Sequence, residues 1–179
     1  RNHVAGPMVC NALSREPADA VEASWLAAVL ESLRQVLAGE STELASLQPL
    51  RAGAAAGPLF PANLSVLTSL VGTPHMPDLS GAILVLEDVG EAAYRVDRYL
   101  NQLCQAGHLE RLAGLVYGQF TEGEDAQWLP AVCADFARPV RGPVAAGLGF
   151  GHGFPSISLP VGRPARLQVE AAGACLCWP

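Results

Sequence analysis

The chain has 179 residues, half of them hydrophobic, and a formal net charge of −6 with a pI near 5.1. This length suits one domain, or one domain and part of another, and the apolar content is enough for a buried core. The cations are eleven arginines spread along an acidic chain, which argues against binding to nucleic acid or to other polyanions. No apolar run of about 18 residues is uninterrupted, so we expect no membrane-spanning helix, and the first seven residues do not form a secretory signal.

The first predicted element is an amphipathic helix from Pro17 to Leu37. Apolar side chains recur at helical spacing, a proline stands in the first turn, and Gly39 ends the pattern. Residues 39–61 are rich in Ala, Gly, Ser and Pro and show little periodicity. We therefore expect a linker there, with one or two short strands, and this stretch is the candidate for a domain boundary.

After residue 62, predicted helices alternate with short apolar strands, which is typical of an α/β fold with a partly parallel sheet. The expected helices are 63–71, 92–106 and 125–136. The expected strands are 81–86, 112–117 (ending at Gly118), 140–146, 156–159 and 165–169. Residues 81–86 form a continuous apolar run between turn residues, as in a buried strand.

The five cysteines are an odd number without the paired spacing of a zinc site. Cys175 and Cys177 form a single C-x-C pair with no histidine nearby. We expect buried, reduced thiols and neither a metal nor another cofactor.

Two acids directly follow the apolar run that ends at Leu86. Asp88 and Glu91 precede a predicted helix, where negative charge is favourable even without a catalytic role. Glu87 shares the strand parity of Ile83 and Val85, so its side chain should point toward a packed face. Because acids are seldom buried without partners, Glu87 is the better candidate for a functional carboxylate.

His152 is the second candidate, in a loop where it is flanked by Gly151 and Gly153. Glycines allow the backbone to approach other groups closely, and a loop histidine that titrates near neutrality suits a general base. An exposed histidine in a tight turn is an equally good interpretation of this pattern. The other histidines have poorer contexts: His3 is near the start, His75 lies between two prolines, and His108 follows a helix.

A carboxylate and a histidine activate a serine or cysteine in many hydrolases, with the nucleophile on a sharp strand-to-helix turn. No serine or cysteine of this chain has that context. From the residues alone, the interpretation ends at half of an active site.

The order of six motifs is similar to that of LD-carboxypeptidases, also called murein tetrapeptide carboxypeptidases, a family that includes microcin C self-immunity proteins. These motifs are Asn63-Leu64-Ser65, Gly72-Thr73-Pro74-His75-Met76-Pro77-Asp78, Ile83-Leu84-Val85-Leu86-Glu87-Asp88, Tyr94-Arg95-Val96-Asp97-Arg98, Gly151-His152 and Leu159-Pro160-Val161-Gly162. The segment Gly6-Pro7-Met8 resembles one that the family carries shortly after its nucleophile. Pro61-Ala62 departs from a Gly-Gly pair of the family and puts any backbone contact of that segment in doubt.

The resemblance implies that Glu87 and His152 are the acid and base of a Ser-Glu-His triad, and that Asn63 binds substrate. The nucleophilic serine would lie about fifteen residues before Arg1. Residues 1–40 would be the end of a flavodoxin-like N-terminal domain, and residues 41–179 a swivelling β/β/α C-terminal domain.

By the same resemblance, the whole protein would cleave the L,D bond before the terminal D-alanine of a murein tetrapeptide, in the cytoplasm and with a homodimer as one possible assembly. This chain without the serine would be inactive. Two alternatives stay open: hydrolysis of a peptidyl-nucleotide antibiotic, as in the immunity proteins, and a catalytically inactive binding or dimerisation module.

Overall fold

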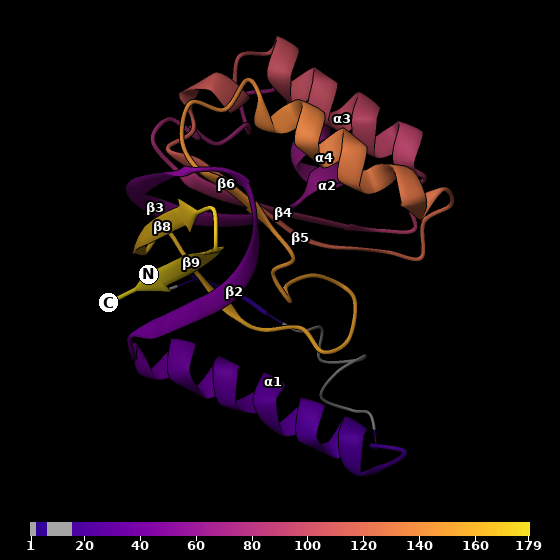
Figure 1. The fold of residues 1–179 in the computed structure, drawn as a ribbon, viewed down its shortest axis with the longest axis vertical. Helices are drawn as coiled ribbons and strands as arrows, with labels where there is room; N and C mark the ends of the chain where they lie inside the picture. Colours follow the sequence, from indigo (N-terminus) through magenta and orange to yellow (C-terminus); the bar gives the residue numbers. More distant parts are fainter. Residues whose placement is uncertain (1–2, 7–15) are drawn as a thin grey trace.

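The computed structural model describes residues 3–6 and 16–179, and a closed, seven-stranded barrel forms its centre (Figure 1). Around the barrel the order is β2-β6-β5-β4-β3-β8-β9. The run from β3 through β4 and β5 to β6 is parallel, and the remaining pairs are antiparallel. The strands are β2 (Thr42–Arg51), β3 (Gly53–Asn63), β4 (Ile83–Val89), β5 (Gly114–Thr121), β6 (Val144–Ala146), β8 (Pro164–Glu170) and β9 (Gly173–Trp178).

The alternating side chains of β4 divide the hydrophobic core into two parts. Ile83 and Val85 pack with side chains of β3, β8 and β9 inside the barrel. Leu84 and Leu86 face outward and pack beneath the helices on one side of it. In Figure 1 these helices lie together at the top, and they are α2 (Leu64–Ser69), α3 (Ala93–Gln105) and α4 (Leu129–Ala137), with the short 3₁₀ turns η2 (Leu109–Arg111) and η3 (Ala126–Trp128).

The helix α1 (Ala20–Ala38) lies on the other side of the barrel (Figure 1). The Asp19 side chain caps its first turn by accepting from two backbone amides, and Gly39 ends it at a positive φ of 74°. The Ser32 hydroxyl accepts a hydrogen bond of 3.0 Å from the backbone amide of Ser158. Nearby, β1 (His3–Ala5) pairs antiparallel with β7 (Leu159–Val161). The domain boundary expected at residue 40 stays a prediction.

The predicted helices are confirmed within a few residues, but the linker expected at residues 39–61 is wrong. Two of the longest strands, β2 and β3, occupy most of that range. Gly57 shows why this strand has small side chains: a Cβ there would lie 2.1 Å from the carbonyl oxygen of Gly81. The close passage of Gly81 requires glycine at position 57, although glycine has low strand propensity.

Two other strand predictions also need correction. The strand β5 does not end at Gly118 but continues to Thr121, and β9 was not predicted at all. In β9 the pair Cys175 and Cys177 belongs to one face of the strand, while Ala174, Leu176 and Trp178 on the other face are buried. Among the described cysteines only Cys133 is buried, so the expectation of buried thiols is wrong for the others, and Cys10 lies outside the described residues.

The segment that departs from the family pattern continues β3 as a regular strand. Pro61 and Ala62 lie in parallel register with Val85 and Leu86. Within residues 3–6 and 16–179, no helix is both long and apolar enough to cross a membrane.

Candidate active site

The parallel strands β3 and β4 end side by side and bring three polar side chains together. Asn63, the last residue of β3, pairs in register with Glu87 of β4, and Asp88 follows. Both carboxylates are only 3% exposed. Functional groups commonly gather at the carboxyl ends of parallel strands, where the following loops can reach them.

A bulge in β5 lies beside Glu87. Leu86 pairs with Tyr117 and Asp88 with Phe120, so Gly118 and Gln119 both lie opposite Glu87. A Cβ at Gly118 would lie 2.5 Å from the carbonyl oxygen of Phe150, and the Gln119 amide donates to that oxygen at 2.8 Å. The bulge therefore holds the segment that carries His152 against the end of the barrel.

Gly151 brings this segment into contact with Glu87. Its φ of 144° favours glycine, and a Cβ there would lie 2.9 Å from Glu87 Oε2. The Gly151 amide donates to Ser156 Oγ at 3.1 Å, and the His152 amide donates to Glu87 Oε2 at 3.1 Å. The close backbone approach that the glycines predicted is an approach to the candidate carboxylate.

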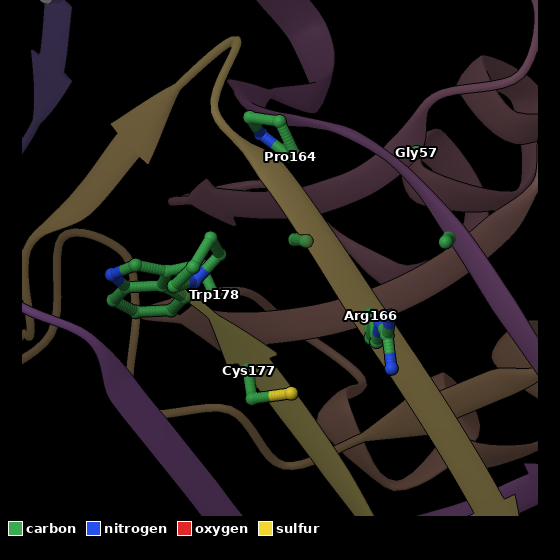
Figure 2. Close-up of a pocket in the computed structure, with 8 residues that line it drawn as sticks. Gly57, Pro164, Arg166, Cys177 and Trp178 are labelled. Atoms are coloured by element: carbon green, nitrogen blue, oxygen red, sulfur yellow. The ribbon is translucent and has the colours of Figure 1, made fainter.

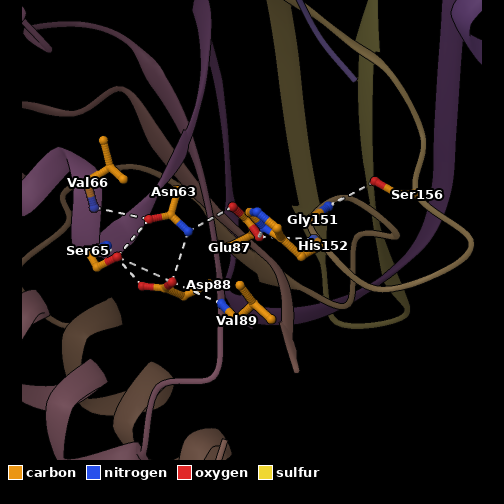
Figure 3. Close-up of polar contacts among 9 residues, drawn as sticks. All are labelled: Asn63, Ser65, Val66, Glu87, Asp88, Val89, Gly151, His152 and Ser156. Atoms are coloured by element: carbon orange, nitrogen blue, oxygen red, sulfur yellow. Dashed lines mark hydrogen bonds and ion pairs between the residues drawn. The ribbon is translucent and has the colours of Figure 1, made fainter. Parts of the chain in front are cut away.

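The imidazole ring of His152 and the carboxylate of Glu87 are in direct contact (Figure 3). His152 Nδ1 lies 2.8 Å from Glu87 Oε2, across 65 residues of sequence. The Glu87 side chain is 4% exposed and the His152 side chain 34%. Because an ionised carboxylate only accepts, Nδ1 carries the proton in this contact, and Nε2 of the neutral ring keeps a lone pair. Such a ring can accept a proton at Nε2 while Glu87 stabilises the resulting imidazolium.

Asp88 has a different environment from the one its sequence position indicates. Its Oδ2 accepts from the Ser65 amide at 2.9 Å, so it serves the first turn of α2 and not that of α3. Asp88 therefore bonds to the first turn of a helix, as predicted, but that helix is α2 and not α3. Glu91 lies just before α3 and forms an ion pair of 3.4 Å with Arg95 in the first turn of that helix.

The other histidines lie away from this pair. His108 follows α3, 3.4 Å from the Arg111 guanidinium, and its pKa is lowered, mainly by burial and also by the nearby charge of Arg111. His75 is exposed in a turn, and His3 is exposed in β1.

Gln119 is a site residue that the sequence did not indicate. Its Nε2 donates to the Pro155 carbonyl at 3.0 Å, and a Cβ at Gly153 would lie 2.8 Å from its Oε1. Gln119 thus holds the far side of the His152 segment. No local signal identified it, because the strand was expected to end at Gly118.

A separate pocket of about 510 Å³ opens on the outside of the barrel between β3, β8 and β9 (Figure 2). Its lining includes Gly57, Arg166 and Trp178. Gly57 precedes Asn63 by six residues on β3, which is about 20 Å along a strand. The part of the chain that the structure describes contains no group of three metal-ligating side chains.

A histidine bonded to a buried carboxylate is part of the machinery with which hydrolases activate a serine or cysteine. Comparison with known proteins then shows the family. Residues 56–167 match the family model of the LD-carboxypeptidase C-terminal domain, and the chain belongs to this family.

Curated relatives extend the match. A relative from Synechocystis sp. that carries the name "Putative carboxypeptidase" is 37% identical over 171 residues, which are 93% of this chain and 54% of the relative. The probable murein peptide carboxypeptidase of Bacillus subtilis is 38% identical over 139 residues, covering 75% of this chain and 44% of the relative. The chain therefore spans about half the length of the curated relatives it matches.

Solved structures share the fold. A muramoyltetrapeptide carboxypeptidase from Oxalobacter formigenes superposes with a TM-score of 0.84 at 30% identity, covering 98% of this chain and 60% of that one. The microcin C7 self-immunity protein MccF superposes with a TM-score of 0.81, covering 99% of this chain and 61% of that one. At 15% identity, the likeness to MccF shows the fold alone.

Proposed function

We propose that the complete protein is a serine-type LD-carboxypeptidase that removes the terminal D-alanine from a murein tetrapeptide. The observation that carries the proposal is the 2.8 Å contact between His152 Nδ1 and the buried Glu87 carboxylate. The preference for a murein peptide comes from the names of relatives that are 30–38% identical. The serine would belong to a preceding flavodoxin-like domain, of which residues 1–40 would be the end.

In this mechanism His152 Nε2 takes the proton of the serine hydroxyl while the serine oxygen attacks the amide carbon before D-alanine. The C–N bond then breaks, His152 returns the proton to the leaving amine, and an acyl-enzyme forms. Water, deprotonated by the same nitrogen, releases the shortened peptide and restores the serine. Glu87 keeps the ring in the tautomer with a free Nε2 and stabilises the imidazolium.

The test measures D-alanine release from murein tetrapeptide by the full-length protein. His152→Ala and Glu87→Gln should each lower kcat by at least about 10³-fold, as loss of a triad member does elsewhere. His108→Ala is the matched control, because His108 lies in a turn near Arg111, and it should leave kcat unchanged. Near-normal turnover by His152→Ala would contradict the assignment.

The two alternatives are outcomes of the same experiment. An acyl-sulfamoyl adenylate is assayed in parallel with the murein tetrapeptide. If its kcat/KM is the larger of the two, the substrate is a peptidyl nucleotide and not a murein peptide. A full-length protein that hydrolyses neither compound would be the binding module. The 179-residue chain alone should show no serine-dependent turnover.

A further inference from the structure

The side chain of Asn63 uses all of its hydrogen-bonding capacity inside the chain (Figure 3). Its Nδ2 donates to Glu87 Oε1 at 3.1 Å and to Asp88 Oδ1 at 2.9 Å. Its Oδ1 accepts from the Val66 amide at 3.0 Å and from Ser65 Oγ at 2.8 Å. A side-chain amide has two N–H donors and two acceptor lone pairs. In this arrangement Asn63 has no hydrogen-bonding group left for a ligand.

Asp88 accepts the second hydrogen bond of the Asn63 amide group, whose first goes to Glu87. Besides Asn63 Nδ2, it accepts from the amides of Ser65 and Val89, each at 2.9 Å. A buried carboxylate that accepts from several backbone donors is held in one orientation. Asn63 thus bridges two buried carboxylates, one held by α2 and the other bonded to His152.

Both oxygens of Glu87 are thereby assigned to different partners. Oε1 accepts from Asn63, and Oε2 faces Nδ1 and the backbone amide of His152. The hydrogen bond to Oε1 opposes rotation of the carboxylate about its last side-chain bond, a torsion that is intrinsically broad. Without it, only His152 itself would hold the Glu87 carboxylate, and the orientation of the oxygen that faces Nδ1 would be less restricted.

We propose that Asn63 and Asp88 are positioning residues that lock the Glu87 carboxylate and so select the Nδ1–H tautomer of His152. This gives Asn63 a positioning role in place of the substrate-binding role that the family resemblance implies. The consequence for turnover rests on the proposed function, whereas the consequence for the tautomer can be measured in this chain without any substrate.

The variants separate positioning from helix capping. Asn63→Ser keeps an oxygen that can cap α2, since serine is a good N-cap residue, but it removes the donor to Glu87. Asp88→Asn keeps the shape and removes a negative charge and an acceptor. Ser69→Ala is the matched control, because its hydroxyl lies on the same helix and donates to the Val66 carbonyl.

The first measurement is nitrogen-15 NMR of the imidazoles in the 179-residue chain at a pH where the rings are neutral. Wild type and Ser69→Ala should show His152 protonated on Nδ1. Asn63→Ser and Asp88→Asn should lower that tautomer's share by about twofold or more, because an imidazole without a fixed partner populates both tautomers. An unchanged tautomer in both folded variants would overturn the proposal, and circular dichroism identifies a variant that is not folded.

The second measurement is turnover by the full-length protein. Asn63→Ser should lower kcat by about 100-fold, the scale expected for a displaced catalytic group, with KM within about twofold. A raised KM with unchanged kcat would instead make Asn63 a substrate contact. If His152→Ala stays active, the proposed function fails, but the NMR result still decides whether Asn63 positions Glu87.

Discussion

Replacement of Gly151 by alanine tests how the His152 segment reaches Glu87. A Cβ at this position would lie 2.9 Å from Glu87 Oε2, 3.0 Å from Glu87 Cβ and 3.1 Å from Gln119 Cβ. Glu87 is buried at the end of β4, so neither of its atoms can move aside freely. The φ of 144° adds strain of about 1–3 kcal/mol for a residue with a side chain.

We therefore expect Gly151→Ala to lower the free energy of unfolding by about 2 kcal/mol and to separate His152 from Glu87. For a chain of this size, this corresponds to a melting temperature about 4–8 °C lower. Calorimetry measures the first effect, and the His152 imidazole NMR signal reports the second.

Gly149→Ala is the matched control in the same segment. A Cβ there meets nothing within 4 Å, and its φ is not in the region reserved for glycine, so its melting temperature should stay close to that of wild type. If Gly151→Ala melted like wild type and kept the Nδ1–H signal, the close approach inferred at Gly151 would be refuted.

Two more predictions concern the barrel and its outer core. Gly57→Ala should destabilise the chain strongly or prevent folding, because its Cβ would lie 2.1 Å from the backbone oxygen of Gly81, whereas Ala56→Ser, exposed on the same strand, should be neutral in urea unfolding. Burial raises the pKa of the Cys133 thiol to about 12, so Cys133 should resist iodoacetamide at pH 8 in the native chain and react normally in urea. A Cys133 thiol that is alkylated rapidly in the native chain would contradict its burial. Because the pKa of this thiol is raised from 9.0 on folding, its contribution to stability is present below pH 9 and is lost as the pH rises toward 12.

Local sequence patterns identified most of the helices and the central strand. The run from Ile83 to Leu86 is apolar at every position because both of its faces are covered, one inside the barrel and one by helices. Strand parity then placed Glu87 on the face of Ile83 and Val85, where the structure also has it buried. These predictions succeeded because their signals lie within a few neighbouring residues.

The strands β2, β3 and β9 were harder to predict, because β2 and β3 lie in a stretch rich in Ala, Gly, Ser and Pro that shows little periodicity. Small residues in β3 allow the backbone at Gly81 to pass close to Gly57. In β9, buried and partly exposed side chains alternate, and the partly exposed positions include the C-x-C pair, a pattern that is also found in metal sites.

The sequence by itself determined the helices, the buried strand that leads to Glu87, the candidate acid and base, and the family that their motifs resemble. Only the tertiary structure decided that His152 meets Glu87, that Asp88 serves α2, and that Asn63 bridges both carboxylates. The reason is that these contacts join residues 23 to 65 positions apart through strand register, a bulge in β5 and the close approach at Gly151. Such contacts depend on how the barrel closes, and no local window of the sequence contains that information.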